Sequence, residues 1–161
     1  MTFRATSDAV AAHLLQSALK PNRPYQLVVP IQYASTLREH LELTQPQIHH
    51  VFQLRPSLFQ PVINVLVQHS AGPDGAQRFR IESQGELMAL SGTNWRSPTF
   101  AEVFVSVHPR AQGRGWGKSV VSACTAHLLT QRLRPLYLAE RDNHTSMRMA
   151  EALGYVDTGA R

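Results

Sequence analysis

Hydrophobic and polar positions alternate through the middle of the chain, and this period of two predicts β-strands. Three such runs cover residues 77–83, 86–93 and 100–108. Gly85 connects the first two runs, and residues 93–98 connect the second and third. Because both connections are short, we expect the three strands to pair as an antiparallel meander.

The hydrophobic spacing then changes to that of a helix. Four apolar residues recur at helical spacing between about 116 and 130, namely Val120, Val121, Cys124 and Leu128. A short strand at 136–139 follows, and Asn143 is placed to cap a last helix that ends before Gly154. This strand–helix–strand order predicts a crossover connection, and hence parallel pairing of the two strands.

The first half of the chain is less regular. Ser7 precedes an apolar helical face that stops at Pro21, which predicts an N-terminal accessory helix within residues 1–21. The other expected elements are a strand at 25–31, helices at 34–43 and 46–54, a strand at 62–67 and a turn at 71–75. The whole pattern predicts a mixed α/β (α+β) fold in one domain, residues 1–161. Its single mixed sheet is antiparallel in the first part, then β–α–β–α, with helices on both faces.

Composition narrows the class of protein. With 161 residues, 43% hydrophobic and 17% charged, the chain suits one globular domain and not a disordered or fibrous protein. No apolar run approaches the roughly 20 residues of a membrane-spanning helix, and the N-terminus lacks the apolar stretch of a secretory signal. The lone Cys124 excludes an internal disulfide and a cysteine-based zinc site. We therefore expect a cytoplasmic protein with no metal.

The net charge of +5 is concentrated in one segment. Residues 96–134 carry six basic side chains and only one acidic one, Glu102. The six are Arg96, Arg110, Arg114, Lys118, Arg132 and Arg134. An anionic ligand near this segment is the natural inference, and a solvated basic face is the alternative.

The same segment contains a glycine-rich turn between a strand and a helix, Val105-Ser-Val-His-Pro-Arg-Ala-Gln-Gly-Arg-Gly-Trp-Gly-Lys-Ser119. Glycine at every second position lets the backbone curl, and the helix start supplies N–H groups without intrahelical partners. Such a turn binds phosphate. A nucleotide P-loop does not fit, because its first glycine is replaced by Gln112; a dinucleotide fingerprint does not fit, because its third glycine is replaced by Lys118.

A third pattern does fit. Gln112-x-x-Gly115-x-Gly117 after Val105-x-Val107-x-Pro resembles the acyl-coenzyme A pyrophosphate loop of the GNAT superfamily of N-acetyltransferases. Asn143, Ser146 and Leu153-Gly-Tyr155 stand at the spacing of a second GNAT motif. The opening Phe100-Ala-Glu-Val103 is similar to Phe-Ala-Glu-Ile of the histone-acetylating branch.

The resemblance implies an enzyme that moves an acetyl group from acetyl-CoA to a primary amine of a small molecule or peptide. It assigns the acyl-CoA-binding and catalytic core to residues 100–155. The residues implied to bind acetyl-CoA or coenzyme A are Val105, Val107, Gln112, Gly113, Arg114, Gly115, Trp116, Gly117, Lys118, Asn143 and Ser146. Arg110 is a further candidate beside the loop.

The resemblance also implies catalytic roles. Glu102 stands where the histone-acetylating branch has its general base, which would deprotonate the amine directly or through water. A backbone N–H near Ser106 or Val107 would polarise the thioester carbonyl, because in the family this strand splays from its neighbour. The tyrosine that many GNAT enzymes use to protonate the leaving thiolate is replaced by Ala150.

Two rival functions stay open at this point. Ala150 and the short C-terminus suit a non-catalytic acyl-CoA-binding or sensor module. A basic nucleic-acid-binding domain is disfavoured, because residues 96–134 offer only Phe100, Phe104 and Trp116 for base stacking. In this architecture the acceptor amine would be selected by the first 60 residues and by loops near 69–76 and 93–99. Only six residues follow Tyr155, so a partner subunit could complete the last strand pair, which predicts a homodimer.

Overall fold

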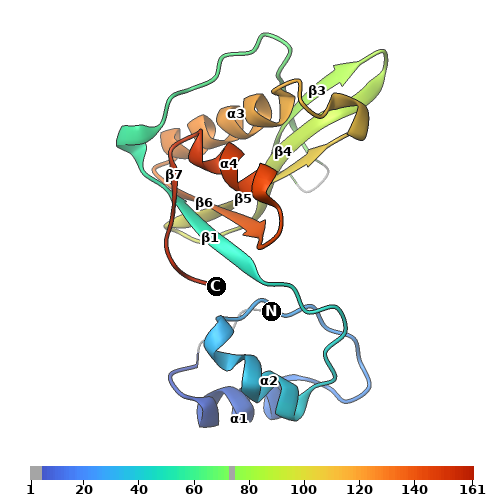
Figure 1. Cartoon of the computed structure of the whole chain (residues 1–161), viewed down its shortest axis with the longest axis vertical. Helices are drawn as coiled ribbons and strands as arrows, with labels where there is room; N and C mark the ends of the chain where they lie inside the picture. The colour runs from blue at the N-terminus through green and yellow to red at the C-terminus, as the bar shows by residue number, and fades with distance from the viewer. Residues whose placement is uncertain (1–4, 73–74) are drawn as a thin grey trace. The chain divides into compact units, whose positions relative to one another are not determined.

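The computed structural model describes residues 5–72 and 75–161 (Figure 1). These residues form two compact units, one of residues up to Ile48 together with Ala160–Arg161, and one of His49–Gly159. The predicted turn at 71–75 falls partly outside the described residues, because it includes Pro73 and Asp74.

The smaller unit contains two short helices, α1 (Asp8–Ala18) and α2 (Ala34–His40), with a 3-10 turn η1 (Ile31–Tyr33) before α2. The Ser7 side chain accepts a hydrogen bond from the Val10 N–H, as expected of a helix N-cap. The helices pack through buried apolar residues, namely Ala11, Leu15, Tyr33 and Leu37. The strand predicted at 25–31 is wrong: residues 25–30 have no regular structure. Pro24 and Pro30, which cannot donate to a ladder, bracket them.

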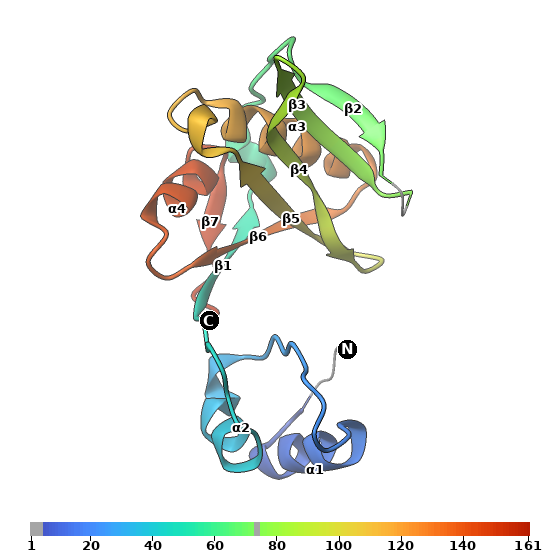
Figure 2. The same cartoon turned by 90° about the vertical axis from the view of Figure 1, so that its right-hand side faces the viewer.

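The larger unit is built on one seven-stranded mixed sheet (Figure 2). Its strands lie in the order β2-β3-β4-β5-β6-β1-β7. Their bounds are β1 His49–Leu54, β2 Gln68–Ala71, β3 Gln77–Ser83, β4 Glu86–Arg96, β5 Phe100–Val107, β6 Arg134–Glu140 and β7 Tyr155–Asp157. Strands β3, β4 and β5 form the predicted antiparallel meander, and β5 pairs with β6 in parallel, so both expectations are confirmed.

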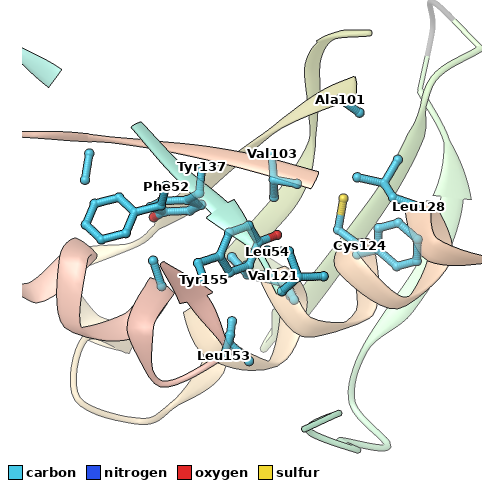
Figure 3. Close-up of a cluster of buried hydrophobic side chains, with 14 of the residues drawn as sticks. Phe52, Leu54, Ala101, Val103, Val121, Cys124, Leu128, Tyr137, Leu153 and Tyr155 are labelled. Atoms are coloured by element: carbon cyan, nitrogen blue, oxygen red, sulfur yellow. The ribbon is translucent and has the colours of Figure 1, made fainter. Parts of the chain in front are cut away.

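Two helices cover one face of this sheet: α3 (Trp116–Thr130) connects β5 to β6, and α4 (His144–Glu151) connects β6 to β7. Both crossovers run in the same direction across the sheet, and right-handed connections place both helices on the same side. Figure 3 shows the two helices on that side of the strands. The mixed α/β architecture is confirmed, but among the described residues of this unit no helix covers the second face.

Strand β1 corrects the helix predicted at 46–54. Its residues pair on both sides, with β6 from His49 to Gln53 and with β7 from Phe52 to Leu54. Phe52 and Leu54 alternate into the core. The hydrogen bonds and side-chain packing of these two ladders stabilise the strand more than the local helical preference suggested by Pro46 stabilises a helix. β7 pairs with β1 on one side and is the last strand of the sheet order, so no described strand pairs with its other side. The homodimer stays a prediction.

The segment between β1 and β2 corrects another prediction. Residues 62–67 form no strand, and Ile63 and Val65 are 91% and 95% exposed. The Val62 N–H bonds to the Ser122 hydroxyl of α3 instead of to a neighbouring strand. The Asn64 side chain accepts from the Leu66 N–H, which closes a local turn. An apolar run was therefore not sufficient to make a strand here.

The core lies between the sheet and helices α3 and α4 (Figure 3). The hydroxyl groups of Thr125 and Tyr155, both buried, hydrogen-bond to each other at 2.7 Å. Gly154 ends the α4 segment with φ +90°, and a side chain there would meet the Leu58 carbonyl at 2.7 Å. The core thus fixes the positions of β5, α3 and α4, which carry the candidate site.

Candidate active site

The glycine-rich turn is an exposed loop between β5 and α3. After Val107 the chain makes one 3-10 turn, η3 (Pro109–Ala111), and reaches α3 through residues 112–115. Gly113 and Gly115 have φ values of +76° and +73°, in the left-handed region that favours glycine. A methyl group at either position would meet no atom within 4 Å. The backbone conformation, and not lack of space, requires glycine at both.

Most N–H groups from Gln112 to Lys118 have no acceptor in the described part of the chain. Gln112 and Arg114 donate long hydrogen bonds of 3.3 and 3.4 Å to carbonyls of η3. The N–H groups of the next residues have no hydrogen-bond acceptor among the described residues: Gly113, Gly115, Trp116, Gly117 and Lys118. These donors lie at the positive end of the α3 dipole. The loop can therefore accept an anion without first breaking strong bonds of its own.

The start of α3 lies very close to β5. A methyl group on the buried Gly117 would stand 2.8 Å from Val107 Cγ2, which is closer than packed carbon atoms approach. It would also be 3.5 Å from the Met149 sulfur of α4. Only glycine lets the first turn of α3 approach the end of β5 and the side of α4 at the same time.

Basic side chains border the loop. The Arg114 guanidinium lies 5.2 Å from the centre of the Trp116 ring. Arg110 is exposed and its Nη1 lies 3.4 Å from Glu86 Oε2. Lys118 lies in the first turn of α3, two residues beyond Trp116. The loop thus combines free N–H groups with nearby cations, as a diphosphate site requires.

Strands β5 and β6 part beside this loop. Their ladder joins residues 100–103 to 134–137, yet β5 continues to Val107 and β6 to Glu140. The Arg134 N–H bonds to the Thr99 carbonyl, so odd-numbered residues of β5 direct their backbone groups toward β6. The N–H groups of Val105 and Val107 therefore point to the side that β6 has left.

Ser106 is placed differently. The His108 N–H bonds to the Met88 carbonyl, and the Phe104 carbonyl accepts from the Ser91 hydroxyl on β4. Even-numbered residues of β5 therefore direct their backbone groups toward β4, where Ser106 stands opposite Leu90. Of the two donors expected from the sequence, only the N–H of Val107 faces the opening, together with that of Val105.

Glu102 lies on the sheet face that α3 does not cover. Its neighbours Ala101 and Val103 are buried against α3, so alternation along β5 directs the Glu102 side chain to the opposite face. The register of β4 shifts between Thr93 and Trp95, and the Asn94 side chain donates a 2.7 Å hydrogen bond to Glu102 Oε1. The connection predicted at 93–98 is partly strand, because β4 continues to Arg96. The register of β4 against β5, which no local pattern indicates, brings Asn94 to Glu102.

The second motif serves the start of α4. The Asn143 side chain accepts from the Ser146 N–H at 2.9 Å and caps the helix. The Ser146 hydroxyl hydrogen-bonds to the Tyr137 hydroxyl at 2.7 Å. Burial raises the pKa of Tyr137, and the bond to Ser146 partly opposes that rise. Tyr137, which sequence reasoning had not singled out, stands on the last rung of the β5–β6 ladder.

Ala150 and Cys124 are both buried in the core. Ala150 has no exposed surface, and its methyl group belongs to the apolar cluster under the sheet. Burial raises the pKa of the Cys124 thiol to about 12, so the thiol stays protonated and unreactive at neutral pH. The described part of the chain contains no group of three His, Cys, Asp or Glu side chains suited to a metal ion. Nor does it contain a helix long and apolar enough to cross a membrane.

Solved structures show the same fold. A GNAT-family acetyltransferase from Novosphingobium aromaticivorans is 18% identical, with a TM-score of 0.61 over 68% of this chain and 59% of its own. One from Colwellia psychrerythraea is 14% identical, with a TM-score of 0.61 over 80% and 59%. A tandem GNAT protein from the clavulanic acid biosynthesis pathway is 13% identical, with a TM-score of 0.57 over 92% and 66%. The chain thus spans about three fifths of the length of the first two.

The family assignment rests on the sequence match. No curated protein matches the sequence significantly. The family model for the acetyltransferase (GNAT) family, however, matches residues 40–155, which include β1, the glycine-rich loop and both motifs. The match covers well over half of the chain, and the sheet, the crossover and the parted strands agree with it. The chain therefore belongs to the acetyltransferase (GNAT) family.

Proposed function

We propose that the chain transfers an acetyl group from acetyl-CoA to a primary amine of a small molecule or peptide. The observation that carries the proposal is the set of unpaired N–H groups at the start of α3, beside a β5 edge whose own N–H groups face an opening. The N–H groups at the start of α3 are suited to a pyrophosphate, and those along the β5 edge are suited to an extended thioester arm. The donor set therefore fits coenzyme A.

The loop residues divide the work of binding. Gly113, Gly115 and Gly117 leave the backbone open to the diphosphate, while Arg114 and Lys118 supply positive charge. Gln112 leads the backbone into the loop, and Trp116 supports the Arg114 guanidinium. Asn143 and Ser146 hold the first turn of α4.

The backbone of β5 would orient the thioester. The N–H groups of Val105 and Val107 are the donors that can bind the coenzyme arm and polarise the acyl carbonyl. Because they belong to a strand held by β4 and by α3, they need little rearrangement to do so. Rigid donors of this kind stabilise developing negative charge more effectively than water does.

Glu102 would act as the general base. It lies three residues before Val105, about 10 Å along the strand, so a water molecule would relay the proton from the amine. The Asn94 N–H group holds one carboxylate oxygen and leaves the other to accept the proton. Positioned proton transfer of this kind contributes about 10²–10⁴-fold to the rate.

The leaving thiolate would depart without a dedicated tyrosine. Ala150 is fully buried, and the nearby Ser146 hydroxyl is bonded to Tyr137. With a thiol pKa near 8.5, releasing the thiolate unprotonated at pH 7 costs only about 2 kcal/mol. We therefore expect a slow enzyme and not an inactive one.

Ala150 also favours the alternative function, a non-catalytic acyl-CoA sensor. Both functions require acetyl-CoA to bind, and only the enzyme releases thiol when an amine is added. The test is calorimetric binding of acetyl-CoA, coenzyme A and ATP, followed by thiol detection with a panel of amines. Binding of both coenzymes but not ATP, with turnover that Glu102→Gln abolishes, supports the enzyme.

Two other results are informative. Binding without turnover for any amine would favour the sensor, and no coenzyme binding would refute both functions. Light scattering of the same sample tests the predicted homodimer separately.

A further inference from the structure

A cavity lies at the end of α3 that is opposite the glycine-rich loop, and we call it the distal cavity. Its volume is about 300 Å³. The lining includes side chains of three elements: Phe79 of β3, Thr93 and Arg96 of β4, and His127, Leu128 and the C-cap residue Gln131 of α3. His127 is about 16 Å along the helix from Trp116, where α3 begins. The distal cavity is therefore separate from the loop proposed to bind coenzyme A.

A shift in the register of β4 directs Arg96 to the side of the sheet that holds this cavity. Thr93 pairs with Val103 and Arg96 pairs with Ala101, and both partners are buried on the side of α3. Residues paired across a ladder share a face of the sheet, so Thr93 and Arg96 both face the helix. In a regular strand, residues three positions apart face opposite sides; the extra residue Asn94 removes this difference.

The distal cavity carries one positive charge. Among its described lining residues, Arg96 alone is charged at neutral pH. Burial and the neighbouring His69 lower the pKa of His127, so its imidazole is neutral, while burial raises the pKa of the lining Cys124 to about 12 and keeps its thiol protonated. In the part of the chain that the structure describes, neither the Arg96 guanidinium nor the Thr93 hydroxyl has a hydrogen-bond partner. A free guanidinium beside neutral polar groups favours a single small anion.

The rest of the lining is apolar and aromatic. Phe79, Cys124 and Leu128 are buried residues of the core cluster. The Phe79 ring is parallel to that of His69, with centres 4.7 Å apart, and its centre lies 5.6 Å from that of the His127 ring. Such a group of rings favours a further aromatic ring packed against it. An apolar cavity of about 150 Å³ can hold benzene, so the distal cavity has room for a ring with a short polar arm.

Arg96 and Gln131 also line a second cavity of about 380 Å³, so both side chains lie where the two cavities meet. The Gln131 amide nitrogen lies 2.8 Å from His127 Nε2. Because an amide nitrogen can only donate, the imidazole nitrogen accepts this bond. The bond fixes the Gln131 side chain and leaves its second N–H for a ligand near Arg96.

We propose that the distal cavity binds an aromatic carboxylate, a small acid with one ring and a short arm. The carboxylate pairs with the Arg96 guanidinium and accepts hydrogen bonds from Thr93 and Gln131. The ring packs on Phe79 and Leu128. This ligand is distinct from the coenzyme and from the amine, so the proposal does not depend on acetyl transfer.

NMR titration of the full chain tests the proposal, because it measures dissociation constants up to the millimolar range. The probes are 3-phenylpropionate, its neutral amide and hexanoate, which keeps the charge but has no ring. We expect the Kd of 3-phenylpropionate to be about tenfold or more below those of the other two probes. Arg96→Gln should raise the Kd of the acid about tenfold and leave that of the amide unchanged. Thr93→Val, which keeps the shape but removes the hydroxyl, should raise the Kd of the acid several-fold.

Arg132→Gln is the matched control. Arg132 follows Gln131 directly and carries the same charge as Arg96, but it is exposed and is not among the residues that line either cavity. Lys118→Gln is a second control, because it removes a charge beside the glycine-rich loop. Neither control should change the Kd of 3-phenylpropionate. A loss in Arg132→Gln as large as in Arg96→Gln would show general charge attraction, and a loss in Lys118→Gln would place the acid at the loop; either result overturns the proposal.

The other outcomes are equally decisive. No binding of 3-phenylpropionate at millimolar concentration, or equal Kd values for the acid and its amide, overturns the proposal. Hexanoate bound as tightly as 3-phenylpropionate overturns the aromatic class of the ligand. Thermal unfolding of each variant separates loss of folding from loss of binding. Because none of these probes is an amine, the results do not depend on whether the chain transfers acetyl groups.

Discussion

The Asn94 Nδ2 donates a 2.7 Å hydrogen bond to Glu102 Oε1, across the point where the register of β4 shifts against β5. The shift leaves Asn94 without a partner residue in the ladder and directs its side chain to the only carboxylate of β5. One neutral donor thus orients the proposed base without changing its charge. Two substitutions at residue 94 test that role.

Asn94→Ala should lower kcat several-fold, because the carboxylate loses a hydrogen bond worth about 1 kcal/mol at a partly exposed position. Asn94→Asp replaces the N–H donor by a second carboxylate that repels Glu102, so it should lower kcat further than Asn94→Ala does. The measurement is kcat for both variants and the parent chain with the same amine. Equal kcat in all three proteins would show that Asn94 does not orient the base.

Gly115→Ala should weaken coenzyme A binding. Its φ of +73° strains any L side chain by about 1 kcal/mol, and relaxing that strain moves the free N–H groups of the loop. Gly85→Ala is the matched control, because Gly85 has φ +77° and equally open surroundings but lies in the β3–β4 turn. Both should lose similar stability in urea, while calorimetry should show weaker binding only for Gly115→Ala. Equal binding in the two variants would argue against a phosphate at the loop.

Gly117→Ala should destabilise the protein by about 1–3 kcal/mol, because its methyl group would overlap Val107 Cγ2 at 2.8 Å. Val107→Ala removes that atom and keeps the backbone N–H of residue 107. The double variant should therefore recover part of the stability and of the coenzyme affinity that Gly117→Ala loses. Additive losses in a urea titration would mean that the contact between α3 and β5 is not the cause.

Stability should fall at alkaline pH because of the buried thiol. Burial raises the pKa of Cys124 from 9.0 to about 12, so between these values the folded chain holds a proton that the unfolded chain has released. The free energy of unfolding then decreases as pH rises from about 9 to about 12, by at most about 1.4 kcal/mol per pH unit for this group. Burial also raises the pKa values of Tyr137 and Tyr155, which act in the same direction.

Cys124→Ala isolates the thiol. Urea titrations at several pH values from 7 to 11 should show a shallower alkaline loss for this variant than for the parent chain. Parallel curves would show that the thiol does not titrate differently in the folded and unfolded states.

Local features of this protein were determined by the sequence alone. The meander, α3, the cap at Asn143 and the left-handed glycines follow from spacing and from backbone preferences that act over a few residues. The glycine-rich loop was predicted for the same reason, since positive φ and free N–H groups are properties of neighbouring residues.

Long-range features were decided by the tertiary structure. Residues 49–54 form a strand because β6 and β7 both pair with them. Residues 62–67 form no strand, because the Val62 N–H bonds to a hydroxyl group of α3 and the Leu66 N–H bonds to the Asn64 side chain. The parting of β5 from β6 after Val103, and the contact of Asn94 with Glu102, likewise depend on which strands meet. Such pairings join residues distant in the chain, and their energies come from ladders and burial that no local pattern records.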